Sequence, residues 1–118
     1  MKKHDYSSAE FYFSEGNVKA ESRDFKNAID DYSKAILSHP GLAVVYYYRG
    51  SARMHLDDHL GAILDYTMAI RLEPDDGDPY LGRGLAYLSR GEKEKARSDF
   101  EMAKNHGVSV DANAIDEL

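Results

Sequence analysis

A ten-residue stretch recurs twice in this chain at a spacing of 34 residues. Residues 27–36 read NAIDDYSKAI, residues 61–70 read GAILDYTMAI, and residues 95–104 read KARSDFEMAK. A fixed period of this length is typical of stacked-repeat architectures, in which each unit leaves an apolar face that its neighbours cover. The sequence of 118 residues therefore predicts one domain made of three similar units.

Each unit shows the three-four spacing of apolar and small residues that indicates α-helices. In the first unit, Tyr12, Gly16 and Ala20 form one stripe, and the run 25–36 carries a second. A polar break separates the two, and Asp24 at its end is a good N-cap for the second helix. The first unit is therefore predicted to be a helix-turn-helix, whose first helix begins at about Ser8.

The second and third units follow the same plan. A second helix is predicted over 60–70 in the second unit. In the third unit Asp78 is predicted to cap the first helix, with Pro79 in its first turn, where a missing N–H does no harm. Residues 105–107 read as a helix stop, so the remainder offers at most one short helix, capped by Asp111.

Three helix-turn-helix units with this period resemble the tetratricopeptide (TPR) repeat. With units starting at 9, 43 and 77, five of the family's marker positions fill in every unit. The fourth holds Tyr12, Tyr46 and Tyr80; the eighth Gly16, Gly50 and Gly84; the twentieth Ala28, Ala62 and Ala96; the twenty-fourth Tyr32, Tyr66 and Phe100; the twenty-seventh Ala35, Ala69 and Ala103. Small residues let two helices approach closely, and aromatic rings fill the space beside them. The closing proline is present as Pro40 and Pro74 but is Val108 in the third unit.

The resemblance implies an all-α fold, a right-handed superhelical array of three units. Residues 1–8 would be a polar N-terminal lead-in, and residues 9–108 the TPR domain, with units 9–42, 43–76 and 77–108. Residues 109–118 would be a C-terminal tail or short capping helix. Val108, Val110, Ile115 and Leu118 could then make a short apolar cover for the third unit.

The seventh position of each unit departs from the family pattern because it is charged, and the twenty-third position is an aspartate in all three units. The seventh position, usually leucine, holds Glu15, Arg49 and Arg83, and the twenty-third holds Asp31, Asp65 and Asp99. We hypothesise that each arginine pairs with the aspartate of the preceding unit, Arg49 with Asp31 and Arg83 with Asp65. The first unit has no predecessor, and it alone lacks the arginine.

The resemblance also implies a partner-binding groove lined by the first helix of each unit. Its candidate residues are Phe13, Asn17, Val44, Tyr47, Tyr48, Ser51, Met54, Leu81, Leu85 and Leu88. This surface is unusually apolar in the second and third units, and monomeric proteins rarely expose a contiguous apolar patch without a use. The expected ligand is an apolar or helical segment of a partner. The alternative is that the chain's own tail, or a second copy of the chain, covers the groove.

TPR domains that hold the C-terminal carboxylates of chaperones use a clamp of lysine, asparagine, asparagine, lysine and arginine. Only Asn17 matches this set. Phe13, Tyr48, Asp78 and Gly82 stand at the other four positions. A carboxylate would meet Asp78 in place of a cation, so the sequence argues against a chaperone C-terminus as partner.

Composition excludes several other classes of function. The net charge of -6 argues against nucleic acid and against an anionic membrane surface. No stretch approaches the ~20 apolar residues of a membrane span, and the N-terminus lacks the apolar run of a signal peptide. The absence of cysteine removes disulfides and thiolate chemistry, and it fits a reducing compartment, so we expect a cytoplasmic protein.

Sites for metals or catalysis find little support. His55 and His59 are four residues apart, a metal-binding spacing on one helix, but they straddle a predicted turn. Residues 75–78 read DDGD, a fragment of a calcium loop without the later ligands. There is no glycine-rich phosphate loop and no nucleophile elbow. We therefore expect no enzyme activity and no cofactor.

The predicted function is a protein–protein interaction module that binds a peptide or helical segment in its groove. The alternative is a homo-oligomerising scaffold whose interface is its own groove or its open C-terminal end.

Overall fold

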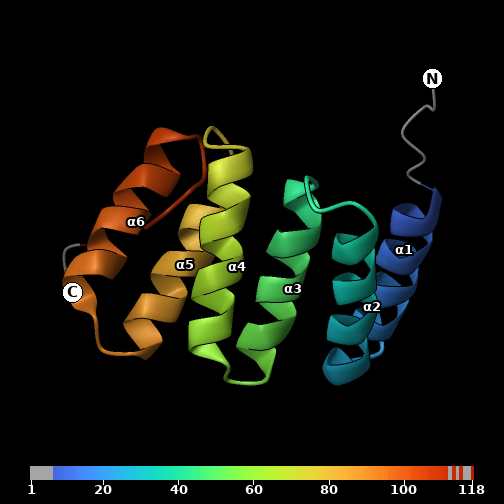
Figure 1. Cartoon of the computed structure of the whole chain (residues 1–118). Helices are drawn as coiled ribbons and strands as arrows, with labels where there is room; N and C mark the ends of the chain where they lie inside the picture. The colour runs from blue at the N-terminus through green and yellow to red at the C-terminus, as the bar shows by residue number, and fades with distance from the viewer. Residues whose placement is uncertain (1–6, 112, 114, 116–117) are drawn as a thin grey trace.

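The structure, a computed structural model, describes residues 7–111, 113, 115 and 118. Six α-helices make up this part of the chain, and no strand occurs in it (Figure 1). They are α1 (Ser7–Glu21), α2 (Phe25–Ser38), α3 (Ala43–His55), α4 (His59–Leu72), α5 (Asp78–Ser89) and α6 (Lys93–Asn105). The all-α prediction is confirmed. Because α1 begins at Ser7, the predicted lead-in 1–8 overlaps it by two residues, and residues 1–6 lie outside the described part.

The helices form three hairpins that stack side by side into an array measuring 50 × 32 × 20 Å. Figure 1 shows two layers, with α2, α4 and α6 on one side and α1, α3 and α5 on the other. Each hairpin packs on the next through α2 against α3 and α4 against α5, and α3 also contacts α5 directly. In the same layer α1 and α3 meet through the rings of Phe13 and Tyr48, whose centres lie 5.3 Å apart.

The predicted Asp24 cap of α2 is confirmed, and the predicted Asp78 cap of α5 is not. Asp24 caps α2 by accepting from the Asn27 N–H, and Asp58 caps α4 by accepting from the Gly61 N–H at 3.0 Å. The prediction that Asp78 caps α5 is wrong. Asp78 is the first residue of α5, and its N–H donates to Asp76 Oδ1 at 3.1 Å. Gly77 takes the cap position without a side chain.

The close packing around Gly77 explains this difference. A Cβ at Gly77 would lie 2.6 Å from Val108 Cγ2 and 3.0 Å from the Ala103 carbonyl oxygen. A capping side chain at this position would require Val108 to shift, because real Cβ atoms essentially never approach so closely. Asp76, one residue earlier, supplies the acceptor in its place.

The small and aromatic marker residues form the core, as predicted. Tyr32 is fully buried, and a Cβ added to Gly16 would lie 2.6 Å from its ring. Gly84 stands in the same relation to Phe100, at 2.6 Å. Each hairpin thus closes because glycine in its first helix leaves room for the aromatic ring of its second.

The hypothesis that each arginine pairs with the preceding unit's aspartate is wrong. Arg49 donates from Nε and Nη2 to Asp65 at 2.9 and 2.8 Å, and Arg83 donates to Asp99 in the same way at 2.8 Å for both bonds. Both pairs lie within one hairpin. Forked contacts of this kind are the strong, geometrically specific form of the arginine–carboxylate interaction. The bond to Asp99 raises the pKa of Arg83.

The third nitrogen of each arginine makes the link between units. Arg49 Nη1 donates to Ser33 Oγ at 3.1 Å, and Arg83 Nη1 donates to Thr67 Oγ1 at 3.2 Å. A hydroxyl of the preceding unit therefore takes the place that we predicted for its aspartate. Asp31, in the first unit, instead pairs with Lys19 of its own hairpin.

The tail covers part of the third hairpin. Ile115 is buried against Ala96 and Phe100, with Val110 and Leu118 beside it. The Asp111 side chain accepts from the Asn113 N–H at 2.9 Å, as expected of a cap. The predicted short helix also involves residues 112, 114, 116 and 117, which lie outside the described residues.

Candidate partner-binding groove

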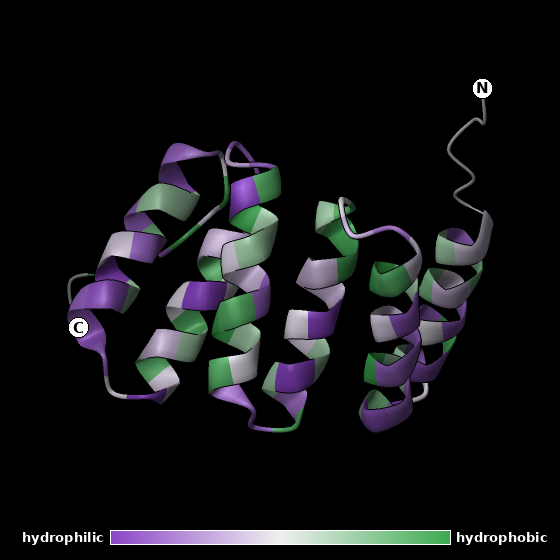
Figure 2. Ribbon diagram, viewed as in Figure 1, coloured by the Kyte–Doolittle hydropathy of each residue, from purple (hydrophilic) through white to green (hydrophobic). Residues whose placement is uncertain are grey.

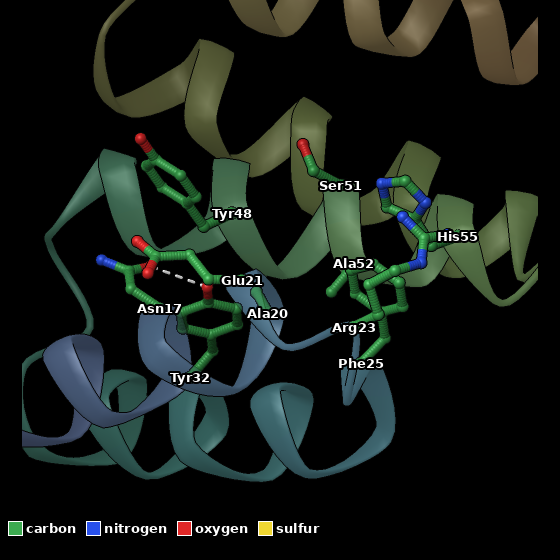
Figure 3. A pocket seen from close by; sticks show the side chains of 10 residues that line it. All are labelled: Asn17, Ala20, Glu21, Arg23, Phe25, Tyr32, Tyr48, Ser51, Ala52 and His55. Carbon is green, nitrogen blue, oxygen red and sulfur yellow. Dashed lines mark hydrogen bonds between the residues drawn. The ribbon is translucent and has the colours of Figure 1, made fainter.

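Two adjoining hollows flank α3 on the layer of α1, α3 and α5. The first, of about 500 Å³, lies between α1, the start of α2 and α3, and it is lined by Asn17, Ala20, Glu21, Arg23, Phe25, Tyr32, Tyr48, Ser51, Ala52 and His55 (Figure 3). The second, of about 230 Å³, lies between α3 and α5, and it is lined by Tyr47, Ser51, Met54, His55, Tyr66, Asp78, Leu81, Gly82 and Leu85. Ser51 and His55 belong to both, so we call the two hollows together the groove.

The structure distributes the predicted site residues over three places. Asn17, Tyr48 and Ser51 line the first hollow, and Tyr47, Ser51, Met54, Leu81 and Leu85 line the second. Phe13 and Val44 line a separate hollow of about 350 Å³ with Ala9, Glu10, Leu42 and Val45. Leu88 lines none of the three, although its side chain is partly exposed.

The floor of the groove contains two tyrosines that the sequence analysis assigned to the scaffold alone. The Tyr32 hydroxyl donates to Asn17 Oδ1 at 2.7 Å (Figure 3), and the Tyr66 hydroxyl lies 3.0 Å from Ser51 Oγ. Burial raises the pKa of both tyrosines to about 12, so both hydroxyls stay protonated at neutral pH. The sequence contained a signal for these two hydrogen bonds. The ninth position of the repeat is polar in the two units whose twenty-fourth position is a tyrosine. In the third unit these positions hold Leu85 and Phe100.

One end of the first hollow carries positive and aromatic groups. The rings of Phe25 and His55 stack at 4.1 Å with an angle of 3°, and the Arg23 guanidinium carbon lies 5.3 Å from the centre of the Phe25 ring. Figure 3 shows Arg23 and His55 at this end, with Asn17, Glu21 and Tyr48 at the other. The sequence analysis missed Arg23 and Phe25, because both lie outside the first helices. The hollow therefore offers hydrogen bonds and charge.

The second hollow is more apolar. The Tyr47 ring packs 5.7 Å from that of Tyr66, and Leu81, Leu85 and Met54 lie around it. Leu85 is 45% exposed. The charged group lining this hollow is the carboxylate of Asp78, and the imidazole of His55 lines both hollows. The groove thus changes from polar to apolar along the array.

Metal ligation finds no support in the described part of the chain, where no group of three His, Asp or Glu side chains could hold an ion. His55 ends α3 and stacks on Phe25, while His59 begins α4. None of the described helices is long and apolar enough to cross a bilayer.

Comparisons with known proteins place this architecture. No protein-family model and no curated protein match the sequence. Among solved structures, the first TPR of Spaghetti (RPAP3) bound to the HSP90 peptide SRMEEVD superposes with a TM-score of 0.90 at 24% identity, over 96% of this chain and 91% of that one. The TPR domain of Arabidopsis OM64 gives 0.89 at 24% identity, over 95% and 93%. The chain has the fold of a TPR domain. A yeast complex, TPR2B of Sti1 with pHsp70, gives 0.85 at 26% identity, over 94% and 92%.

In this TPR domain the groove differs from a carboxylate clamp by charge. Phe13 and Tyr48 pack against each other, with ring centres 5.3 Å apart, at two positions where the clamp has a lysine and an asparagine. Asp78 and Gly82 line the second hollow at the last two positions of the clamp. The groove lining does contain an arginine, Arg23, but this residue lies in the turn before α2 and not at a clamp position.

Proposed function

We propose that this TPR domain is a non-enzymatic interaction module, and that the groove along α1, α3 and α5 binds a peptide or helical segment of another protein. The observation that carries the proposal is the pair of adjoining hollows, with exposed apolar side chains in the second. None of the described tail residues lines either hollow; Ile115 packs against Ala96 and Phe100, in a cluster that Leu81 borders from the second hollow. The groove is therefore open to a partner.

The chemistry of the groove supports a segment with two kinds of residue. One or two apolar side chains would enter the hollow beside Tyr47, Leu81 and Leu85, as in helix-in-groove recognition. A polar or acidic side chain would lie near Arg23 and His55 in the first hollow. Apolar burial would supply most of the affinity, and the polar end would set the direction of the segment.

A chaperone C-terminus is not the partner that we propose. The compared TPR domains of Spaghetti and Sti1 are bound to HSP90 and pHsp70 peptides. In this chain the carboxylate of Asp78 would repel a terminal carboxylate. Phe13 has no donor where the clamp has a lysine, and Tyr48 offers one hydroxyl in place of an amide. The same fold therefore serves a different ligand chemistry.

The test is a comparative pull-down with a matched control. The double variant Tyr47→Ala/Leu85→Ala should lose partners that the native chain retains, because both side chains line the second hollow. Val18→Ala is the control, since Val18 is an exposed apolar residue of α1 that lines none of the three hollows. Circular dichroism of all three proteins checks the fold. Unchanged partners for the double variant, or no partner for the native chain, would count against the groove as the site.

Self-association through the groove is the alternative use of the same surface. It is favoured by the exposure of Leu85 in the second hollow, and it requires no foreign partner. Light scattering over a concentration series distinguishes the two. An oligomer formed by the native chain but not by the Tyr47→Ala/Leu85→Ala variant would favour the alternative.

A further inference from the structure

The outward side of α1, at one end of the array, carries two exposed apolar residues (Figure 1). Phe11 is 57% exposed and Val18 is 59% exposed. By helical geometry these two residues and Glu15 fall within about 60° of one another around the α1 axis, so they share one face. None of the three lines any of the hollows described above. We call Phe11, Glu15 and Val18 together the α1 end face.

The positions of Phe11 and Val18 are the third and tenth of the repeat, and the other two units bury both. The residues at these positions in the other units are Val45, Ala52, Pro79 and Ala86. In the second unit the covering helix is α2, because Ile29 and Ile36 pack against the cluster that contains Val45 and Ala52. The α1 end face is therefore the surface on which a neighbouring helix packs inside the array, without that helix.

The opposite end of the array is finished in a different way. At the twenty-first and twenty-eighth positions α2 and α4 carry isoleucines, whereas α6 carries Arg97 and Lys104. The tail also reaches this end, since Arg97 Nη2 donates to the Leu118 carbonyl oxygen at 2.7 Å. Figure 2 shows α6 mostly in purple and pale colours. Terminal repeats require a polar outer face for solubility, so α6 follows this rule and the apolar residues of α1 depart from it.

Glu15 sets the charge of the α1 end face. Arg49 occupies the same position of the second unit, and it donates to Ser33 of the covering helix at 3.1 Å. A carboxylate accepts hydrogen bonds only, and glutamate is shorter than arginine, so a helix covering α1 needs a longer donor where α2 has Ser33. Lys19, one turn after Glu15, is paired with Asp31. Glu15 itself forms no ion pair in the described part of the chain.

We propose that the α1 end face binds an amphipathic helix of a partner protein, which lies on α1 as α2 lies on α3. The partner helix presents two apolar side chains seven residues apart, with the spacing of Ile29 and Ile36. These side chains pack on Phe11 and Val18. Four residues after the first of them, the partner helix carries a lysine that pairs with Glu15. The ligand is thus a helix with a basic residue between two apolar residues on one face.

A second copy of this chain does not have this chemistry. In an antiparallel pair of α1 helices, with Phe11 of each copy packed on Val18 of the other, the two Glu15 carboxylates come to the same level of the interface and repel each other. In a head-to-tail stack, Glu101 of α6 takes the position of Ser33 and again faces Glu15. The end face shares no residue with the groove, so this proposal does not rest on the proposed function.

The probe is a peptide of residues 24–41 with the change Ser33→Lys. This segment contains α2, which covers the equivalent face of α3. Because isolated helices of this length are marginal in water, a hydrocarbon staple joins positions 27 and 31, on the side of the helix away from Ile29 and Ile36. Circular dichroism of the peptide alone verifies that it is helical before any titration. A lack of binding then cannot be due to an unfolded peptide.

The first test is an NMR titration of the isotope-labelled full chain with this peptide. The amide signals around Phe11 and Val18 should shift, and that of Leu85 in the groove should not. Val18→Glu should lose the peptide, and Leu64→Glu is the matched control, because Leu64 is 70% exposed on α4. Val18→Ala, the control for the groove, should still bind the peptide, since Ala52 serves at this position in the second unit.

Three outcomes of the titration would overturn the proposal. The first is that the helical peptide leaves the signals around Phe11 and Val18 unchanged. The second is that Val18→Glu binds the peptide as tightly as Leu64→Glu does. The third is that these signals shift with the concentration of the chain alone, which would show that a second copy covers the face.

A charge exchange tests the role of Glu15. The native chain should bind the Ser33→Lys peptide about fivefold more tightly than the stapled peptide that keeps the serine. Glu15→Arg should reverse this preference, because the new arginine can donate to the serine as Arg49 does and would repel the lysine. Arginine at this position of the other two units shows that the repeat accepts it. The same preference in both proteins, with the fold intact by circular dichroism, would rule out the pairing with Glu15.

Discussion

Each hairpin buries one aspartate, and each aspartate has a cation from the facing helix. Asp65 accepts from two arginines, Arg49 and Arg53, at 2.8 to 2.9 Å. Asp31 has Lys19 instead, whose side chain is 39% exposed. A buried carboxylate is tolerated only with such partners, and removing one member of the pair leaves the other charge uncompensated. The three units therefore differ in how strongly this interaction holds them.

Asp65→Ala should lower the free energy of unfolding by about 3 kcal/mol, because two partly buried guanidinium groups lose their carboxylate. Asp31→Ala is the matched control, and its loss should be smaller, since the Lys19 ammonium can turn into solvent. Urea unfolding followed by circular dichroism measures both. Equal losses would contradict the view that burial of the cation sets the cost.

The sequence identified these charged residues but not their partners. The 34-residue period places Arg49 against two aspartates, Asp31 and Asp65, and the choice between them depends on three-dimensional distances. The hydroxyls that receive the third nitrogen did leave a signal. The twenty-fifth position is Ser33 and Thr67 in the two units that have a successor, and it is Glu101 in the last.

At the scale of the helices, the distance between the two helices of each hairpin depends on the glycine in its first helix. Gly84→Ala should lower the unfolding free energy by about 1–3 kcal/mol, because the new Cβ would lie 2.6 Å from the buried Phe100 ring. Gly50→Ala should be nearly neutral. Its Cβ would lie 3.1 Å from the Tyr66 ring, and this milder crowding is offset by the gain in helix propensity of about 1 kcal/mol. Gly84→Ala has the same gain, but its closer contact outweighs it. Thermal unfolding of the two variants decides whether the steric difference is real; a larger loss for Gly50→Ala would reverse the argument.

The helices themselves were predictable, because their ends carry local signals such as Asp24. The cap at α5 was not predictable, because the crowding at Gly77 comes from residues distant in the sequence. These are Ala103 of α6 and Val108, which follows α6. The groove shows the same division. Residues of the first helices could be placed by their position in the repeat. Arg23 and Phe25 enter the groove from a turn and from α2, where the repeat pattern makes no prediction.

At the scale of the whole molecule, stability should fall steeply in alkaline solution. Tyr32 and Tyr66 have pKa values of about 12 against 10 in the unfolded chain. Between these values the unfolded chain releases protons that the folded chain keeps. The unfolding free energy therefore decreases as pH rises from 10 to 12, by up to about 1.4 kcal/mol per pH unit for each tyrosine, and these residues contribute no pH dependence below that window.

Tyr66→Phe should remove about half of this alkaline decrease, at a cost near neutral pH of about 1 kcal/mol for the contact with Ser51. Phe100 shows that a ring without a hydroxyl fits this position of the repeat. Denaturant unfolding at a series of pH values from 8 to about 12 makes the comparison. An unchanged slope in the variant would mean that other groups control the alkaline transition.

The bonds from Arg49 to Ser33 and from Arg83 to Thr67 have a consequence for ionic strength. Within the described part of the chain, every ion pair lies inside one hairpin, and these junctions between hairpins are closed by a hydroxyl that carries no charge. Screening by salt acts on exposed charges and little on a neutral acceptor or on apolar contact. The curvature of the array, and with it the width of the groove, should therefore be the same in dilute buffer and in concentrated salt.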